Sequence, residues 1–348
     1  MDACGRGAVK ISIVLLTHRE TENLACSCLR SLEGAGAPAE AEVLVGYNGA
    51  WPDDEPSFER LRALFPWARF VALENAPRGA ARNRLVPLAH GEIIHFLDDD
   101  TMVPPGFLRR LRRAYERHPG APALGGPNVG PPGAAPFERA VDFLLRSPFG
   151  AGPMRVRYLR RGKPRSRPSW CFMLSNLGAR RHVFFEKRIF FPEDCVSAEE
   201  NLFLHHVASR LGEALFDPRL YVHHKRRTDL ASFCRQVACN GMGRAQITRT
   251  NAATLQAVVL APVGAAAAFP LLVAAGRWRA LAVLGASYAA LCAFEMGRLA
   301  LAESDPEAAL RLAVLFAAAH ASYAWGFARG LLQAGQRAPV RLPKTADA

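Results

Sequence analysis

Short apolar runs that alternate with helix-like segments constrain the fold of this chain most. Four runs rich in apolar and β-branched residues end in polar residues, namely VKISIVLLTHRE, AEVLVGYNGA, ARFVALENA and EIIHFLDDD. Segments with apolar residues at helical spacing follow these runs, and several of them end at glycine or proline. Strands that alternate with helices at this rhythm predict an α/β fold with a parallel sheet.

Polar residues mark the carboxyl ends of these predicted strands. Thr17 ends the first run, Tyr47 and Asn48 end the second, and the acids 98–100 end the fourth. In open parallel sheets, ligands bind in the crevice outside the carboxyl ends of the strands. We therefore expect one crevice to collect these side chains.

Three consecutive acids, Asp98, Asp99 and Asp100, stand out in a chain whose formal net charge is +13. Adjacent carboxylates repel one another, so a cation, a basic surface or water must compensate them. Side chains two apart on a strand share a face, so Asp98 and Asp100 present two carboxylates on one side. This geometry suits one divalent metal, since Mg²⁺ or Mn²⁺ prefers such oxygen ligands. The alternative is a solvated acidic turn that caps the next helix.

Positive charge is concentrated in two segments, RVRYLRRGKPRSRP (155–168) and HHKRR (223–227). They are either solvated loops or sites for anionic lipid headgroups or a phosphate-bearing substrate. The sequence has no zinc-finger, RNP-like or helix-turn-helix signature, so nucleic acid is not an expected partner. The eight cysteines show no CxxC spacing, which predicts reduced thiols and no structural zinc site.

Towards the C-terminus the composition shifts to Ala, Leu and Val, and three apolar segments follow one another at 252–275, 280–297 and 311–332. Each approaches the length of about 20 residues that a membrane span needs, so we expect three transmembrane helices. A soluble Ala-rich bundle is the alternative. The basic residues before the first span, and the lack of a signal-peptide pattern, favour a cytosolic N-terminal part. Arg277 and Arg279 leave an interfacial or re-entrant hairpin open.

Three stretches in this order, ISIVLLTHRE, EVLVGYNGA and RGAARNRLVPLAHGEIIHFLDDD, resemble the successive signatures of the family 2 glycosyltransferases of the GT-A type. The resemblance runs from Val9 to Arg244. It implies a GT-A catalytic domain over 1–250, with a mostly parallel sheet flanked by helices. A membrane region of three transmembrane helices (251–335) and a tail (336–348) would follow. The resemblance also implies inverting transfer of a sugar from a nucleotide-diphosphate sugar, with Mg²⁺ or Mn²⁺ as cofactor.

The resemblance implies a donor pocket built from the strand ends and the G-x-x-ARN helix. Its donor-binding residues would be Thr17, Arg19, Glu20, Asn48, Arg78, Gly79, Arg82, Asn83, Asp98 and Asp99. Asp100, together with Asp98, would hold the metal, while Asp99 would point away from it or toward the donor nucleoside. Tyr47 is a departure, because the family usually has there an Asp that helps to hold the nucleoside. The nucleobase therefore stays open.

An acidic pair in SAEENLFLHH, Glu199 and Glu200, would supply the catalytic base. Inverting transfer needs one carboxylate to take the proton from the acceptor hydroxyl. The family usually has Glu-Asp at this place, and the match puts the base at Glu200. The alternative is a pair of charges that interacts with the helix N-terminus.

The segment LYVHHKRRTDLASFCRQVACNGMGR holds further candidates. The resemblance implies that a histidine here approaches the metal or the diphosphate. Only one of His223 and His224 can face the site if both lie on a strand. Arg235 and Arg244 would hold the leaving diphosphate or the acceptor, or equally lipid headgroups.

GGPNVGPP (125–132), the basic loop and the late spans resemble membrane-anchored members of the family that build exopolysaccharides on lipid carriers, the succinoglycan-type transferases. The expected partners are a nucleotide-diphosphate sugar donor, a lipid-linked or glycan acceptor, and membrane lipids. The expected location is the cell (inner) membrane, as a multi-pass protein with a cytoplasmic catalytic domain.

Two other functions stay open from the sequence. An Asp-dependent phosphatase or phosphotransferase is one, because FLDDDTM loosely matches D-x-D-x-T, although Thr101 comes one residue too early. A non-catalytic membrane protein with a degenerate transferase domain is the other, and Tyr47 is the feature that supports it. The sequence names neither the sugar, the nucleobase nor the acceptor.

Overall fold

The computed structural model describes residues 9–18, 24–193, 195, 197–252, 255 and 260–333. The strands are β1 (Ile11–Thr17), β2 (Glu42–Gly49), β3 (Arg69–Glu74), β4 (Ile93–Asp98), β5 (Thr101–Met102), β6 (Ala123–Gly125), β7 (Asn128–Val129), β8 (Arg165–Arg167), β9 (Leu177–Arg180), β10 (Ala214–Phe216) and β11 (Val222–His224). The helices are α1 (Leu24–Gly34), α2 (Ala37–Glu40), α3 (Glu55–Leu64), α4 (Arg78–Leu85), α5 (Phe107–Arg117), α6 (Pro136–Arg146), α7 (Pro148–Ala151), α8 (Arg181–Phe185), α9 (Glu199–Leu211), α10 (Leu230–Thr250), α11 (Ala261–Ala274), α12 (Trp278–Glu303) and α13 (Pro306–Leu332). Short 3₁₀ helices cover Val86–Leu88, Gly152–Tyr158, Ser169–Cys171 and Leu174–Asn176.

The four apolar runs of the sequence form adjacent parallel strands. The large sheet has the order β3-β2-β1-β4-β9-β6-β10-β8, with β9 antiparallel to both of its neighbours and β8 antiparallel to β10. Every residue of β1 is buried, as expected for a central strand covered on both faces. The register pairs Thr17 with Tyr47 and Leu16 with Asp98, so the polar ends of three strands lie side by side. The predicted α/β fold with a mostly parallel sheet is confirmed.

A second, three-stranded sheet has the order β5-β11-β7. Strand β5 begins directly after the acidic run, and its Thr101 pairs with His224 of β11. A segment more than 120 residues further along the chain is therefore brought beside the acids. This pairing is what completes the site described below.

The segment 125–170, rich in glycine, proline and basic residues, includes the eleven-residue helix α6. Pro136 at its first turn and Glu138, whose carboxylate accepts from the Ala135 amide, favour the start of the helix. One face of α6 buries Val141 and Leu144 in a core cluster shared with α10, α12 and α13. The helical C-terminal part therefore packs directly on the middle of the chain.

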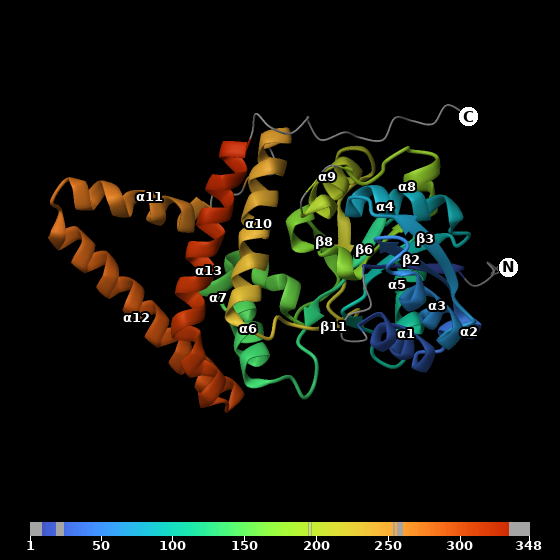
Figure 1. The fold of residues 1–348 in the computed structure, drawn as a ribbon, viewed down its shortest axis with the longest axis horizontal. Helices are drawn as coiled ribbons and strands as arrows, with labels where there is room; N and C mark the ends of the chain where they lie inside the picture. The colour runs from blue at the N-terminus through green and yellow to red at the C-terminus, as the bar shows by residue number, and fades with distance from the viewer. Residues whose placement is uncertain are drawn as a thin grey trace, which may run out of the picture.

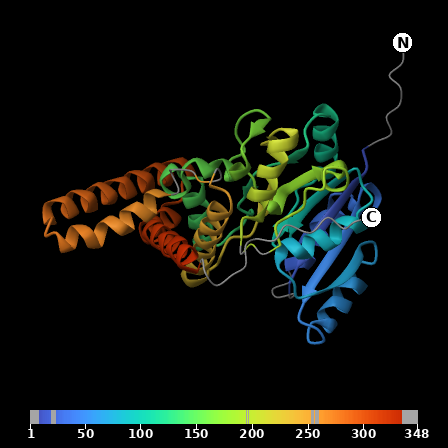
Figure 2. The ribbon, with the colours of Figure 1, turned by 90° about the horizontal axis from the view of Figure 1, so that it is seen from above.

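The C-terminal helices lie at one end of the molecule, beside the sheet (Figure 1). Helices α10 and α13 pack along each other, and α11 and α12 form a hairpin that projects away from the body in both views (Figures 1 and 2). Within the described residues, α12 and α13 are long and apolar enough to cross a membrane. Helix α11 has only 14 residues, which is about 21 Å and shorter than a bilayer core of about 30 Å. The predicted first span lies partly outside the described residues.

Large apolar side chains on the C-terminal hairpin are exposed. Phe269, Trp278 and Phe294 are each more than 60% accessible, which is unusual for a surface that faces water. At the inner end of α12, by contrast, Glu295 is buried and accepts a hydrogen bond of 2.9 Å from Ser147 at the start of α7. One end of the hairpin is thus fixed to the body by a polar contact, while its remainder presents an apolar surface.

Candidate active site

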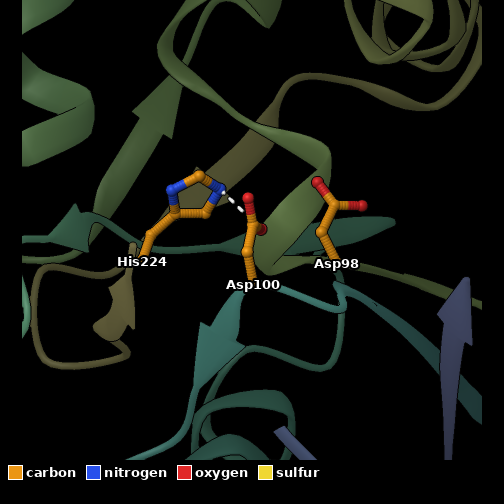
Figure 3. Close-up of side chains that lie close together, drawn as sticks. All are labelled: Asp98, Asp100 and His224. Atoms are coloured by element: carbon orange, nitrogen blue, oxygen red, sulfur yellow. Dashed lines mark ion pairs between the residues drawn. The ribbon is translucent and has the colours of Figure 1, made fainter. Parts of the chain in front are cut away.

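The acidic run at the carboxyl end of β4 and strand β11 bring Asp98, Asp100 and His224 close together (Figure 3). Asp98, Asp100 and His224 each offer a ligand atom, and these atoms all lie within 4.8 Å of one another. His224 Nε2 lies 3.1 Å from Asp100 Oδ1. The strand pairing between β5 and β11 fixes this approach, because His224 stands opposite the residue that follows Asp100.

The three side chains fit a divalent cation. The buried His224 Nδ1 has no hydrogen-bond partner among the described residues, and the buried Asp100 Oδ1 contacts His224 Nε2 at 3.1 Å. Burial opposes ionisation of Asp100, but the neighbouring His224 and Arg227 charges hold the pKa of its carboxyl below the ordinary value. Carboxylates with an imidazole are a ligand set that Mn²⁺ accepts, and the carboxylates alone suit Mg²⁺. These residues could therefore hold either ion.

The two adjacent histidines point in opposite directions. His224 faces the acids, whereas His223 Nδ1 lies 3.1 Å from the carbonyl oxygen of Gly130, the residue directly after the neighbouring strand β7. This follows from the alternation of side chains along β11. Of the two histidines that the sequence left open, the structure places His224 at the site.

Asp99 turns toward β1 and away from the pair that could hold the metal. Its carboxylate accepts a hydrogen bond of 2.9 Å from Thr17 Oγ1. Burial, together with the neighbouring Asp100 charge, raises the pKa of Asp99 to about 7. The Thr17 hydroxyl and Asp99 carboxyl thus form a polar wall next to the predicted metal site.

Arg82 of α4 joins two parts of the site that are distant in sequence. Its guanidinium is 3% accessible and donates to Asp98 Oδ1 at 2.7 Å and to Glu199 Oε1 at 2.8 Å. Asn83, the next residue, holds the segment before α9 through hydrogen bonds with Phe191. Helix α4 thereby sets the distance between the acidic run and the start of α9.

The two acids at the start of α9 have different surroundings. Glu199 is paired with Arg82, whereas Glu200 accepts a hydrogen bond of 2.7 Å from the Asn201 side chain. Burial and the adjacent Glu199 charge raise the pKa of Glu200 to about 7. Ala198, immediately before them, has a φ of 63°, a left-handed conformation that alanine rarely adopts. The backbone strain is placed beside the acid that is able to exchange a proton near neutral pH.

Tyr47 and Asn48 at the end of β2 lie on opposite sides of the strand. Tyr47 is fully buried in the core, with ring contacts to Trp51 and Phe58. Asn48 exchanges two hydrogen bonds with the backbone of Ala76, at 2.8 and 2.9 Å. Tyr47 is therefore a packing residue, and Asn48 is the side chain that β2 presents at the crevice.

A cleft of about 1310 Å³ runs past most of these groups and reaches the C-terminal helices. Of the residues predicted for the site, those that line it are Thr17, Asn48, Arg78, Arg82, Asp98, Asp99, Asp100, Glu199, Glu200, His224 and Arg244. Gly79, Asn83, His223 and Arg235 do not line it, and Arg235 is exposed. Arg19 and Glu20 lie outside the described residues. The cleft thus collects the strand ends, as the parallel sheet predicted.

Other polar residues of the cleft were not predicted individually. They include His18, Asn75, Arg157, Lys225, Arg227 and Asn240. His18 Nδ1 lies 2.6 Å from the Asn48 carbonyl oxygen. Lys225 and Arg227 flank the site histidine in the HHKRR segment, so their proximity to the acids could have been inferred from that pattern. Arg157 lies in the short 3₁₀ helix Gly152–Tyr158, whose path the sequence does not fix.

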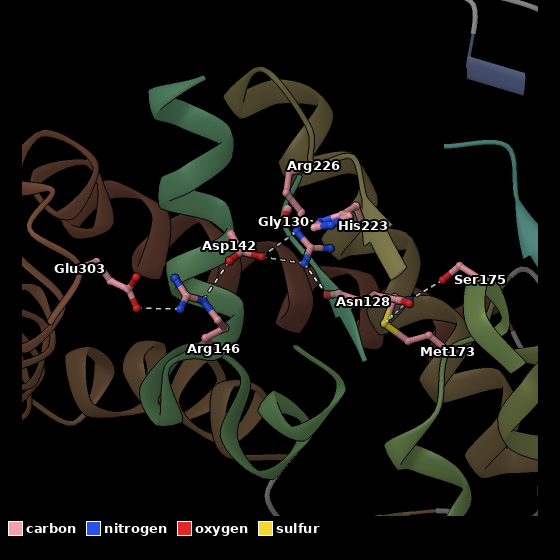
Figure 4. Close-up of polar contacts among 9 residues, drawn as sticks. All are labelled: Asn128, Gly130, Asp142, Arg146, Met173, Ser175, His223, Arg226 and Glu303. Carbon is pink, nitrogen blue, oxygen red and sulfur yellow. Dashed lines mark hydrogen bonds and ion pairs between the residues drawn. The ribbon is translucent and has the colours of Figure 1, made fainter. Parts of the chain in front are cut away.

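A row of charged contacts ties β11 to the helical part of the molecule (Figure 4). The buried Arg226 donates to Asp142 Oδ1 and to the Asn128 carbonyl oxygen, both at 2.7 Å. Asp142 also pairs with Arg146 at 2.9 Å, and Arg146 pairs with Glu303 at the end of α12 at 2.7 Å. The strand that carries the site histidine is thus held by contacts that extend to the C-terminal hairpin.

The fold and the cleft define a glycosyltransferase of the GT-A type. Residues 12–184 match the model of glycosyl transferase family 2, and the chain belongs to that family. It is 33% identical over 155 residues to the succinoglycan biosynthesis protein ExoM of Rhizobium meliloti (strain 1021). That match covers 42% of this chain and 49% of ExoM, so the chain spans about half the length of this curated relative.

Among solved structures, the mannosyltransferase PcManGT from Pyrobaculum calidifontis, in complex with GDP-Man and Mn²⁺, has a similar fold. The TM-score is 0.61 at 19% identity, and the likeness covers 95% of this chain and 89% of PcManGT. At this identity the likeness shows a shared fold. The shared fold confirms the predicted GT-A architecture, and the family match confirms the glycosyltransferase class.

Proposed function

We propose that this protein transfers a sugar, with inversion, from a nucleotide-diphosphate sugar to a lipid-linked or glycan acceptor at a membrane, with a divalent metal bound. The observation that carries the proposal is the meeting of Asp98, Asp100 and His224 in the same cleft as Glu200. Such a cleft offers a site for an anionic donor and a proton acceptor for the incoming hydroxyl. ExoM is named for succinoglycan biosynthesis, which supports a polysaccharide precursor as the acceptor.

Asp98, Asp100 and His224 would hold Mn²⁺ or Mg²⁺. The ion would neutralise the charge on the diphosphate as it leaves. Lys225 and Arg227, which follow the histidine and line the same cleft, are placed to add positive charge there. PcManGT was solved with GDP-Man and Mn²⁺, which supports a donor of this chemical class for the present chain.

Thr17, His18 and Asn48 form the polar end of the cleft at β1 and β2. We assign the donor nucleoside to this end, because the side chains offer hydrogen bonds next to the predicted metal site. Tyr47 does not block this end, since its ring lies in the core. This removes the observation that favoured a degenerate, non-catalytic domain.

Glu200 is the proposed base. Of the two acids, Glu199 is held by Arg82, so its carboxylate serves to position the start of α9. Glu200 would accept the proton of the acceptor hydroxyl while its oxygen attacks the anomeric carbon and the bond to the diphosphate breaks. Attack on the face opposite to the leaving group inverts the anomeric configuration.

The membrane part of the proposal rests on the C-terminal helices. Helices α12 and α13 have the length and composition of membrane spans, and the hairpin exposes large apolar side chains. The cleft opens toward these helices, so an acceptor anchored in a lipid layer would reach Glu200 from there. We propose the cytosolic face of the cell membrane as the location.

Turnover of nucleotide sugars by membranes that carry the protein tests this proposal. A donor screen with Mn²⁺ or Mg²⁺, read as an increase in thermal stability of the detergent-solubilised protein, first selects the donor. Asp100→Ala and Glu200→Gln should then abolish transfer, whereas His223→Ala, on the opposite face of β11, should retain it. NMR of the product should show an inverted anomeric centre.

Wild-type rates in Asp100→Ala or Glu200→Gln would refute the assignment. Release of inorganic phosphate without sugar transfer would indicate the phosphatase chemistry that FLDDDTM loosely suggests. The structure gives that chemistry no support at Thr101, whose hydroxyl is fully buried and donates to the Asp98 carbonyl oxygen at 2.6 Å.

A further inference from the structure

The cleft has an apolar extension beyond Glu200. This extension, here called the apolar arm, is lined by Leu144, Phe149, Phe233, Val237, Ala265 and Ala319. These residues come from α6, α7, α10, α11 and α13, so the arm lies between the body and the C-terminal helices. A long apolar wall is not required by a nucleotide sugar, whose groups are polar throughout.

Two arginines stand where the arm meets the polar part of the cleft. Arg157 and Arg244 both line the cleft, and their charges act on the Glu200 carboxyl. Within the described part of the chain, neither guanidinium forms an ion pair with a carboxylate. Arg244 is 5% accessible, and burial together with the neighbouring Arg157 charge lowers its pKa. Arginine nevertheless stays protonated in proteins, so two positive charges face each other beside a single carboxyl, that of Glu200.

A hydroxyl group lies next to this pair. The buried Tyr323 hydroxyl on α13 interacts with the Arg244 guanidinium. Arg157 donates to the Trp170 carbonyl oxygen at 2.6 Å and contacts the Asn201 side chain at 3.5 Å, which fixes its guanidinium beside Glu200. Guanidinium groups with a hydroxyl are the donors that bind phosphate oxygens.

We propose that Arg157, Arg244 and Tyr323 bind the phosphate of a phosphate-linked lipid acceptor, with its hydrocarbon chain in the apolar arm. This inference rests on the proposed function and specifies its acceptor. A phosphate-linked lipid combines the two chemistries that the cleft presents side by side, a compact anion and an apolar chain. The donor diphosphate has its own site at Asp98, Asp100 and His224, so the arginines are not needed for it.

The inference explains why the C-terminal helices contribute to the cleft at all. Arg244 and Tyr323 come from α10 and α13, the two helices that pack along each other beside the sheet. Their side chains place the anion site next to Glu200 while their apolar faces continue into the arm. An acceptor bound this way would enter from the side of the molecule that exposes the apolar hairpin.

Binding of farnesyl diphosphate to the detergent-solubilised, full-length protein, measured by isothermal titration calorimetry, tests this site. Arg157→Gln and Arg244→Gln should each weaken binding roughly tenfold or more, because each removes a charged contact to the ligand. Arg235→Gln is the matched control, since Arg235 lies on α10 but is exposed and outside the cleft. Farnesol and inorganic pyrophosphate should each bind far more weakly than farnesyl diphosphate.

The arm is tested in the same assay. Ala265→Gln places a polar side chain in the wall of the apolar arm. It should weaken the binding of farnesyl diphosphate and leave the binding of pyrophosphate unchanged. Ala267→Gln is its control, because Ala267 is on the same helix but does not line the cleft. Equal effects of the two substitutions would place the hydrocarbon chain elsewhere.

Donor binding separates the outcomes. Binding of the nucleotide sugar with Mn²⁺ should be unchanged in Arg157→Gln and Arg244→Gln. If these substitutions weaken the binding of the nucleotide sugar as much as that of farnesyl diphosphate, the arginines bind the donor and the inference is wrong. Wild-type affinity for farnesyl diphosphate in both variants would also overturn it. If Arg244→Gln does not fold, the same two binding measurements are made on Arg157→Gln and Arg244→Lys, and these two variants test the inference. A failure of the proposed function would appear differently, as absence of nucleotide-sugar binding in the wild-type protein.

Discussion

The guanidinium of Arg82 lies 2.8 Å from the carboxylate of Glu199, and both side chains are buried. The two residues are 117 positions apart in the sequence. Because Arg82 also donates to Asp98, this contact fixes the start of α9 against the end of β4. The proposed base follows Glu199 directly, so its position relative to the predicted metal site depends on the pair.

Arg82→Gln should destabilise the protein by about 3–5 kcal/mol, because it leaves the buried Glu199 carboxylate without its partner. The double variant Arg82→Gln, Glu199→Gln should recover much of the lost thermal stability, since no unpaired charge remains, but it should not recover activity. Arg78→Gln on the same helix serves as the control, because Arg78 is exposed and should change the unfolding temperature little. If Arg82→Gln and Arg78→Gln have the same unfolding temperature, the pair of Arg82 and Glu199 does not stabilise the site.

Glu200 should give the transfer reaction a pH dependence near neutrality. The pKa of its carboxyl is raised to about 7 by burial and by Glu199, and only the ionised form accepts a proton. The rate at low acceptor concentration should therefore rise with pH up to about 7 and then level off. A rate that is constant between pH 5.5 and 8 would show that another group takes the proton.

The same pKa shift affects stability with a definite sign. A folded-state pKa above the ordinary value of 4.5 means that the folded protein holds this proton more tightly than the unfolded chain. The stabilisation is therefore fully present below the ordinary carboxyl pKa and is lost as the pH rises through about 7. Glu200→Gln should flatten this part of the stability profile, measured by thermal unfolding at a series of pH values.

The metal ligands can be tested without an activity assay. Asp100→Ala and His224→Ala should each weaken Mn²⁺ binding. The binding is measured from the electron paramagnetic resonance signal of the free ion. His224→Ala should weaken the binding of Mn²⁺ more than the binding of Mg²⁺, because Mg²⁺ prefers oxygen ligands and depends less on the imidazole. His223→Ala is the control, since that side chain faces β7. If His223→Ala loses Mn²⁺ binding and His224→Ala retains it, the assignment of the two histidines is reversed.

Close packing under α4 can be tested at Gly79. A Cβ added at this glycine would lie 2.0 Å from the Pro192 carbonyl oxygen, so Gly79→Ala must push α4 away from the segment before α9. Overpacking of this kind costs about 1–3 kcal/mol, and the shift should also reduce transfer because Arg82 lies on the same helix. Gly34→Ala, where a Cβ meets nothing within 4 Å, should leave both unfolding temperature and activity unchanged. A wild-type unfolding temperature for Gly79→Ala would show that the contact is not tight.

Local patterns in the sequence predicted the parallel strands and the residues at their ends, because burial and strand periodicity act over a few positions. The alternation of side chains also required that only one of His223 and His224 face the acids. It could not decide which, because that depends on the pairing of β11 with β5. Tyr47 shows the same limit, since its position matched a nucleoside-binding Asp although its ring packs in the core.

Contacts between distant segments account for what the sequence did not predict. Arg157 belongs to the basic segment 155–168, which the sequence could place in a solvated loop, but it lies in a 3₁₀ helix and lines the cleft. Helix α6 joins the C-terminal helices through a shared core. The predicted boundary near residue 250, between the catalytic domain and the membrane region, rested on a change in composition. In the structure, α6 and α10 pack with α12 and α13, so composition alone did not indicate this packing.

The charged row from Glu303 to Arg226 gives the last prediction (Figure 4). Asp142→Asn removes the carboxylate that both Arg146 and Arg226 contact, so Arg226 loses the charge that holds it beside β7. Because His224 lies two residues before Arg226, β11 should then be less well fixed, and Mn²⁺ affinity should fall by several-fold. Glu303→Gln, at the partly exposed outer end of the row, should have a much smaller effect.

Mn²⁺ affinity and unfolding temperature, measured together, separate a local effect on β11 from general destabilisation. Arg311→Gln is a matched control for the loss of an ion pair, since its contact with Glu307 is an exposed pair on α13. Asp142→Asn should lower Mn²⁺ affinity, and Arg311→Gln should not. If Asp142→Asn lowers the unfolding temperature but leaves Mn²⁺ affinity intact, the row stabilises the helical part and does not position the site histidine.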